Sequence, residues 1–192
     1  MSDRRASLEL AGHGLEGVGR DLSLLYKFGP QGGRPLMARP LAGLLAAAAR
    51  ASGICRDIDL LAAVPSHGRR VRQRGFDAPH LLARGLARRL RLPGPARLLI
   101  RTDRQQPRSR SKQAFCPDGR FRLRRRAAQR IPGKTVLLLD DIFTTGTTLR
   151  ECAQLLFHAG AGEVRGLVLA RTPRRSMGSP QAVLFDRAGP IV

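Results

Sequence analysis

The strongest constraint on this chain is an apolar run that leads into two adjacent acids and a threonine-rich turn. Residues 136–148 read Val-Leu-Leu-Leu-Asp-Asp-Ile-Phe-Thr-Thr-Gly-Thr-Thr. Four consecutive apolar residues are typical of a strand buried on both faces, and helical periodicity follows the turn. The segment therefore predicts a strand, a loop and a helix, with polar groups at the carboxyl end of the strand, where open α/β sheets bind ligands.

The turn has the composition of a phosphate-binding loop. Consecutive backbone N–H groups and hydroxyls can converge on one phosphate, and the helix that follows adds the positive end of its dipole. A central glycine lets the backbone approach the anion closely. The predicted phosphate-binding residues are Thr144, Thr145, Gly146, Thr147 and Thr148.

The two acids before the turn narrow the choice of ligand. Asp140 and Asp141 would repel a bare phosphate, so the ligand should carry hydroxyl donors or a metal ion beside its phosphate. A ribose 5-phosphate compound meets this requirement, because its 2′- and 3′-hydroxyls can donate to the carboxylates. Since Mg²⁺ could bridge those hydroxyls and a pyrophosphate, we predict that the acids are catalytic and act as indirect Mg²⁺ ligands.

A helix cap or a response-regulator site would each account for part of the same segment. Thr147 or Thr148 could simply cap a helix, and response-regulator sites also place acids at strand ends. A cap needs only one hydroxyl, and a response-regulator site does not need a threonine-rich turn. The complete pattern therefore favours the phosphate site.

Apolar runs and helical periods alternate along the rest of the chain. This alternation predicts an α/β fold with a mostly parallel central sheet flanked by helices. The predicted strands are residues 58–64, 98–100, 136–139 and 164–169, and the helical periods fall at residues 41–48, 81–90 and 149–159.

The remaining segments show weaker patterns. Residues 1–19 have no clear period, so we expect a loose lead-in before one domain spanning residues 20–192. The apolar spacing in residues 22–28 predicts a further short helix. Residues 102–130 carry many arginines and isolated phenylalanines, which predicts a long exposed excursion.

The net charge of the chain indicates which classes of partner it can attract. Its formal net charge is +21, and all but three of its cationic side chains are arginine. Arginine binds phosphate oxygens in a bidentate manner, so nucleic acids, nucleotides and sugar phosphates are plausible partners. Codon bias toward arginine on ordinary solvated surfaces explains the same composition equally well.

The cysteines bear on the cellular compartment. Cys55, Cys116 and Cys152 are far apart in the sequence, so they predict neither a disulfide framework nor a zinc site. A reducing, cytoplasmic setting is therefore expected. Neither a signal peptide nor a membrane-spanning apolar stretch is recognisable, so we expect no membrane insertion.

The acid pair and turn resemble the phosphoribosyl-pyrophosphate motif of type I phosphoribosyltransferases. Four other motifs extend the resemblance to the competence-associated ComF family: Tyr26-Lys27-Phe28, Val64-Pro65-Ser66-His67, Arg72-Gln73-Arg74-Gly75-Phe76-Asp77 and Ala114-Phe115. The resemblance implies a type I phosphoribosyltransferase-like fold and a pyrophosphate-binding loop. That loop would comprise Pro65, Ser66 and His67 with positive charge from Arg72 and Arg74. Taken alone, His67 is better explained as an exposed loop histidine beside arginines.

The chain departs from the ComF pattern in three places. No cysteine precedes Cys55, so we do not expect the cysteine-rich zinc module of the family in this chain. Asp77 and Ala78 stand where the family has asparagine and glutamine. Residues 106–115 are shorter than the mobile hood that excludes water from the reacting carbon, which weakens the case for catalysis.

Two functions are compatible with these features. One is transfer of a ribose 5-phosphate group from phosphoribosyl pyrophosphate, with release of pyrophosphate; residues 170–175 offer no aromatic side chain that would identify the acceptor. The other is a non-catalytic role in DNA uptake through binding of single-stranded DNA or competence proteins. The candidate DNA-binding arginines are Arg120, Arg122, Arg124, Arg125 and Arg126, while the helical stripe Arg84, Arg88 and Arg91 is expected to be solvated surface.

Overall fold

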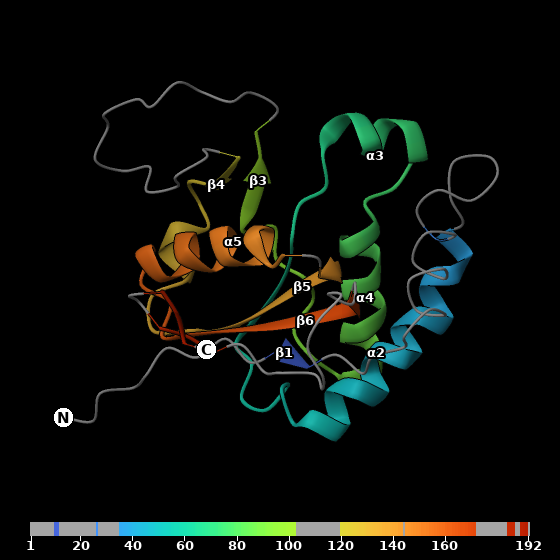
Figure 1. The fold of residues 1–192 in the computed structure, drawn as a ribbon, viewed down its shortest axis with the longest axis horizontal. Coiled ribbons are helices and arrows are strands. Elements are labelled where there is room, and N and C mark those ends of the chain that lie inside the picture. Colours follow the sequence, from blue (N-terminus) through green and yellow to red (C-terminus); the bar gives the residue numbers. More distant parts are fainter. Residues whose placement is uncertain are drawn as a thin grey trace.

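The computed structural model describes residues 10–11, 26, 35–102, 120–143, 145–171, 184–186 and 189–191. Figure 1 shows a central sheet with helices packed against it. The elements are β1 (Leu10–Ala11), the 3-10 helix η1 (Pro35–Met37), α2 (Ala38–Ser52), β2 (Leu60–Ala63), α3 (Gly68–Arg74), α4 (Ala78–Leu90), β3 (Leu99–Arg101), β4 (Phe121–Leu123), the 3-10 helix η2 (Ala128–Arg130), β5 (Thr135–Phe143), α5 (Thr147–His158), β6 (Glu163–Arg171), β7 (Leu184–Asp186) and β8 (Gly189–Ile191).

The central sheet is parallel, as the alternation of strands and helices predicts. Its strand order is β1-β6-β5-β2, and each neighbouring pair is parallel. β5 and β6 exceed the apolar runs predicted for them, because their pairing extends from Thr135 opposite Glu163 to Phe143 opposite Arg171. The predicted fold class is therefore confirmed.

Side chains of the central strand alternate between two apolar layers. Val136 and Leu138 pack with residues of α5, whereas Leu137 and Leu139 pack with residues of α2 and α4. This alternation follows from the two-residue period of a strand. Helices on both faces explain why the strand reads as a continuous apolar run.

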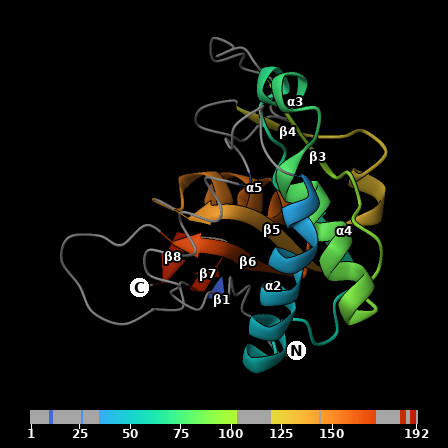
Figure 2. The same cartoon turned by 90° about the vertical axis from the view of Figure 1, so that its right-hand side faces the viewer.

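α2 and α4 lie side by side on their face of the sheet (Figure 2). A Cβ on Gly85 of α4 would lie 2.6 Å from the Cβ of Ala42, so the missing side chain permits close contact. Two side chains also tie the pair: Arg50 donates to the carbonyl of Arg89 (3.0 Å), and Arg89 donates to the carbonyl of Arg39 (2.9 Å). None of the described helices is long and apolar enough to cross a membrane.

The excursion predicted at residues 102–130 is wrong where the structure describes it. Phe121 is fully buried in the core beneath α5 and begins β4, which pairs antiparallel with β3. The run at residues 98–100 also forms a strand, but in this separate two-stranded sheet rather than the central one. Arginines at positions 120, 122, 124, 125 and 126 concealed the inward-facing Phe121 and Ala127 in the sequence pattern. Residues 103–119, and Cys116 with them, lie outside the described residues.

Within residues 1–34 preceding η1, the structure describes Leu10, Ala11 and Tyr26. Leu10 and Ala11 lie in the stretch expected to be a loose lead-in, yet they pair in parallel with β6 as the short strand β1. Tyr26 is helical and fully buried, and its hydroxyl donates to the carbonyl of Ala78 (3.0 Å). The rest of residues 1–34 lies outside the described residues.

Candidate functional site

The two acids lie inside β5 rather than after its end. The strand predicted to stop at Leu139 continues to Phe143 because β6 pairs with it beyond the acids. Asp140 and Asp141 are buried, with 9% and 5% of their surface exposed. The backbone N–H of Asp141 donates to Oδ1 of Asp140 (2.8 Å), which helps to orient the first carboxylate.

Strand alternation directs the two carboxylates to opposite faces of the sheet. Asp140 continues the row of Val136 and Leu138 toward α5 and the turn, while Asp141 continues the row that faces α2 and α4. Tyr26 lies close enough to the second carboxylate for an electrostatic effect. Burial, reinforced by the negative charge of Asp141, raises the pKa of the Tyr26 hydroxyl well above its usual value. The tyrosine of the Tyr-Lys-Phe motif is therefore a neutral neighbour of the site.

The turn after β5 adopts the tight conformation that its glycine predicts. Gly146 has φ of 75°, and a Cβ there would lie 2.7 Å from the ring of Phe143. The hydroxyls of Thr145 and Thr147 are 2.8 Å apart. Thr148 lies in the first turn of α5, and Thr144 lies outside the described residues.

Thr147 and Thr148 do not cap the helix, so that alternative for their role is wrong. α5 begins at Thr147, and its N-cap is Gly146, which has no side chain to form a capping hydrogen bond. The backbone N–H of Thr147 has only a long contact of 3.4 Å to the Thr145 hydroxyl. The first turn of α5 thus retains N–H donors that can serve an anion.

The predicted pyrophosphate loop is only partly a loop. Pro65 and Ser66 follow β2 in extended backbone, but His67 caps α3, a helix that the apolar pattern does not predict, and its Nδ1 accepts from the N–H of Arg69 (3.2 Å). His67 therefore has a structural role. Arg72 and Arg74 lie on this helix, roughly 200° apart around its axis, so they cannot both face one ligand at the loop.

A polar cavity of about 200 Å³ lies beside Pro65 and Ser66. It contains arginines that the sequence pattern does not assign to the pyrophosphate site: Arg97 before β3, Arg101 at the end of β3, and Arg124 after β4. The guanidinium of Arg101 lies 5.3 Å from the centre of the Phe121 ring, so the buried aromatic ring supports it. No sequence pattern links these residues, because the β3–β4 pairing brings them together.

Asp77 and His80 complete the wall of this cavity at the start of α4. Burial and the positive charge of Arg97 lower the pKa of His80, which keeps its imidazole neutral near pH 7. Oδ1 of Asp77 is buried without a hydrogen-bond partner in the part of the chain that the structure describes. The cavity therefore offers three cations to an anion and one unused acceptor to a hydroxyl or a metal ion.

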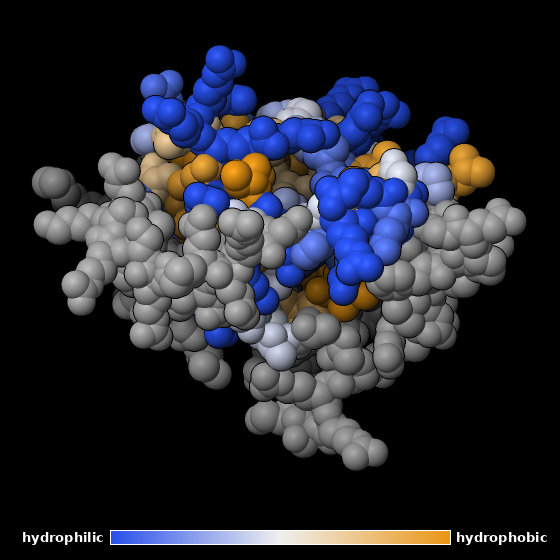
Figure 3. Space-filling model, turned by 90° about the horizontal axis from the view of Figure 1, so that it is seen from above, coloured by the Kyte–Doolittle hydropathy of each residue, from blue (hydrophilic) through white to orange (hydrophobic). Residues whose placement is uncertain are grey.

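The predicted DNA-binding cluster divides into one paired member and four exposed ones. Arg120 forms an ion pair with Glu151, a residue of α5 with 4% of its surface exposed. Arg122, Arg125 and Arg126 are exposed, and so is Arg124, which also lines the polar cavity. Figure 3 shows hydrophilic residues gathered on the face that carries α3, β3 and β4.

The acids can take part in binding Mg²⁺ but cannot complete a site. Among the described residues, no group of three or more His, Cys, Asp or Glu side chains could hold a metal ion. Mg²⁺ usually takes one or two carboxylates together with water and substrate phosphate oxygens. Because the two carboxylates lie on opposite faces of β5, each of Asp140 and Asp141 fits Mg²⁺ only together with oxygens of a bound ligand.

Similarity to known proteins identifies the family to which this site belongs. The model of the phosphoribosyl transferase domain matches residues 80–182, more than half of the 192-residue chain. The chain belongs to the phosphoribosyltransferase family. The matched part of the chain contains the acid pair and the turn, whereas Pro65, Ser66 and α3 lie before it.

Its curated relatives confirm the resemblance to the ComF family. The chain is 34% identical over 121 residues to the DNA utilization protein YhgH of Escherichia coli O157:H7, covering 59% of this chain and 50% of YhgH. It is 29% identical over 114 residues to the competence protein ComFC of Bacillus subtilis (strain 168), covering 59% of this chain and 45% of ComFC. The chain thus spans about half the length of the curated relatives it matches.

A solved structure supports the fold of this chain. The allosteric regulatory enzyme of purine biosynthesis aligns with a TM-score of 0.53 at 20% sequence identity, covering 77% of this chain and 30% of that chain. At this identity the likeness shows the fold alone. The type I phosphoribosyltransferase-like architecture predicted from the sequence is confirmed.

Proposed function

We propose that this protein binds phosphoribosyl pyrophosphate or a related ribose 5-phosphate compound across the turn, the acid pair and the polar cavity. The observation that carries the proposal is the order of these groups along one edge of the sheet. Two buried carboxylates lie in β5, the glycine turn with the start of α5 follows them, and three arginines line the cavity at the end of β2. A ligand with a phosphate, vicinal hydroxyls and a pyrophosphate matches that order.

Each part has a role in this proposal. The N–H groups and hydroxyls from Thr144 to Thr148 anchor the 5-phosphate, and Asp140, on the same face of β5 as the turn, accepts hydrogen bonds from the ribose hydroxyls, while Asp141 on the opposite face adds negative charge. Pro65 and Ser66 border the pyrophosphate, whose charge Arg97, Arg101 and Arg124 balance. Arg72 and Arg74 contribute only long-range positive charge.

If the bound ligand reacts, the protein supplies position and charge rather than a nucleophile. The buried carboxylates stabilise positive charge that develops at the anomeric carbon, and the arginines stabilise the departing pyrophosphate. Mg²⁺, held by Asp140 together with ligand oxygens, would neutralise pyrophosphate charge. The family membership supports transfer of the phosphoribosyl group as the reaction, with the acceptor unspecified.

Isothermal titration of phosphoribosyl pyrophosphate with Mg²⁺ tests this proposal. Asp140→Asn should weaken binding by about tenfold or more, because an amide is a poorer hydroxyl acceptor than a carboxylate. Asp57→Asn is the matched control: Asp57 is an exposed acid at the amino end of β2, with φ of 54°, which asparagine tolerates. Equal affinities for wild type and both variants would contradict the assignment.

A second function, binding of single-stranded DNA, is favoured by the exposed Arg122, Arg125 and Arg126 beside the same face. The names of the two relatives, which refer to DNA utilization and competence, support a role in that setting. A DNA end or a nucleotide could then occupy the phosphate site while the exposed arginines hold the adjoining strand. The competence partner proteins would be further ligands of this face.

A further inference from the structure

A second cavity lies away from the proposed phosphoribosyl site, between the carboxyl-terminal ends of α2 and α4. Its volume is about 540 Å³, within the range of small-molecule sites. It adjoins Gly53, Cys55 and Arg56, which precede β2. The first residue of β2 pairs with Val136, and the acids come four and five residues later in β5. The cavity is therefore at the opposite end of the strands from the acids and the turn.

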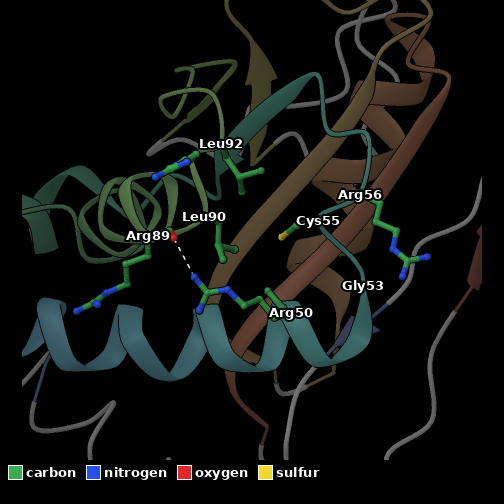
Figure 4. Close-up of a pocket in the computed structure, with 9 residues that line it drawn as sticks. Arg50, Gly53, Cys55, Arg56, Arg89, Leu90 and Leu92 are labelled. Carbon is green, nitrogen blue, oxygen red and sulfur yellow. Dashed lines mark hydrogen bonds between the residues drawn. The ribbon is translucent and has the colours of Figure 1, made fainter.

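The lining combines four arginines with an apolar floor. Ala49, Leu90 and Leu92 supply the floor, and none of the lining residues is acidic. In Figure 4, the side chains of Leu90, Leu92 and Cys55 point into the space between α2 and the sheet, while Arg50 reaches across it. The guanidinium-bearing residues are Arg50, Arg56, Arg89 and Arg91.

Two of these four arginines form hydrogen bonds that stabilise the helix pair, and the other two do not. Arg50 and Arg89 lie in the last turns of their helices, where cations stabilise the helix dipole, and both form hydrogen bonds across the helix pair. Neither Arg56 nor Arg91 has a side-chain hydrogen bond or ion pair within the described residues. Their donors are available to a ligand.

The backbone beside the cavity is also unusual. In the described part of the chain, Asp57 and Arg91 are the non-glycine residues with positive φ, and both have φ of 54°. Arg91 is the C-cap of α4, a position where glycine avoids steric conflict. Non-glycine residues with strained, positive φ are concentrated at binding sites. Glycine at position 91 would relieve the strain, so the arginine there points to a role other than stability.

We propose that this cavity binds a phosphorylated small molecule with an apolar or aromatic body, of the size of a nucleoside monophosphate. The phosphate lies beside the guanidinium group of Arg50, and Arg91 and Arg56, whose side chain points away from Cys55 in Figure 4, add positive charge nearby. The body lies on Leu90 and Leu92. This site is independent of the proposed phosphoribosyl site.

Cys55 provides a local reporter for this proposal. Its thiol is half-buried in the cavity, and burial raises its pKa, so it reacts slowly with disulfide reagents and its rate reports on the charge around it. Cys152 is fully buried, and replacing Cys116 with serine leaves Cys55 as the accessible thiol. Its reaction with the dianionic reagent 5,5′-dithiobis(2-nitrobenzoate) is compared with that of the neutral reagent 4,4′-dithiodipyridine, each normalised to a small free thiol.

The arginines should make the anionic reagent react about tenfold faster than the neutral one, because a positive cavity concentrates anions. That preference should disappear in Arg50→Gln/Arg56→Gln and persist in Arg84→Gln/Arg88→Gln, which removes the same charge from the exposed face of α4. Equal rates for both reagents in the Cys116→Ser protein would overturn the anion site.

The class of ligand is tested by measuring how strongly candidate ligands slow the labelling of Cys55. Adenosine monophosphate should slow the labelling of Cys55, and ribose 5-phosphate or inorganic phosphate at the same concentration should protect less, because neither has a body for the apolar floor. The protection should survive Asp140→Asn, so failure of the phosphoribosyl site and failure of this site are distinguishable. Equal protection by inorganic phosphate, or none by adenosine monophosphate, would refute the proposed ligand.

Discussion

At the scale of single residues, Gly146 decides whether the turn can form at all. Its φ of 75° disfavours any side chain, and a Cβ would meet the ring of Phe143 at 2.7 Å. The glycine therefore lets the chain pass over the aromatic ring on its way from β5 to α5. Any larger residue at this position disturbs folding as well as ligand binding.

Three glycine-to-alanine variants separate the cost of the positive φ from the cost of the clash with Phe143. Gly146→Ala carries both the positive φ and the clash, and should lower the free energy of unfolding by about 2–3 kcal/mol. Gly75→Ala has φ of 78° but no atom within 4 Å of the new Cβ, so it should cost only about 1 kcal/mol. Gly94→Ala has neither problem and should be near neutral. Urea denaturation measures all three, and equal costs for Gly146→Ala and Gly75→Ala would argue against the Phe143 contact.

The residues of the phosphate turn can be predicted from the sequence, but the full pyrophosphate site cannot. The turn residues are contiguous, so their spacing alone predicts convergence on one anion. Arg97, Arg101 and Arg124 come from separate segments and meet only through the β3–β4 pairing. The sequence pattern places Arg72 and Arg74 at a loop, but Gly68–Arg74 forms a helix that turns them apart. Such errors arise because the short segment has no apolar period to indicate a helix.

At the scale of elements, the apolar pattern predicts the central strands β2, β5 and β6, but not where β5 ends or that β4 forms. β2, β5 and β6 each contain a continuous apolar run, which the two covered faces require. β5 nevertheless passes through the acids, because pairing with β6 fixes the backbone regardless of side-chain polarity. Phe121 lies in the core although arginines surround it in the sequence, so local composition could not reveal β4.

The contact between α2 and α4 leads to a prediction at this scale. Gly85→Ala should destabilise the protein by about 1–3 kcal/mol, because its Cβ would lie 2.6 Å from that of Ala42. The double variant Ala42→Gly/Gly85→Ala should recover part of the loss by removing the overlap. Gly43→Ala is the control: its Cβ would have only ordinary contacts with the flexible Arg89 side chain, and better helix propensity should make it neutral or slightly stabilising. Thermal unfolding followed by circular dichroism distinguishes these outcomes, and a neutral Gly85→Ala would refute the close helix contact.

At the scale of the whole molecule, the arginines behind the net charge of +21 include those with structural contacts, those that line the two cavities and those that are exposed. Part of the arginine content is structural, as in the Arg120–Glu151 pair and the bonds between α2 and α4. Another part lines the polar cavity and the cavity between α2 and α4. The exposed Arg122, Arg125 and Arg126 belong to neither group, so any sequence-independent attraction for a nucleic-acid backbone should depend on them.

Binding of single-stranded DNA should therefore be weak, independent of sequence and sensitive to salt. Replacing Arg122, Arg125 and Arg126 with glutamine should reduce the slope of log affinity against log salt concentration by about 2, since each phosphate contact on a single strand contributes about 0.7. The triple variant Arg39→Gln/Arg84→Gln/Arg88→Gln removes the same charge from exposed positions on α2 and α4, and should leave the slope nearly unchanged. Fluorescence anisotropy with a labelled oligonucleotide across a salt series measures both slopes. Equal reductions in the two variants would mean that DNA responds only to the overall charge, whereas loss confined to the first variant locates the strand beside β4 and the proposed phosphoribosyl site.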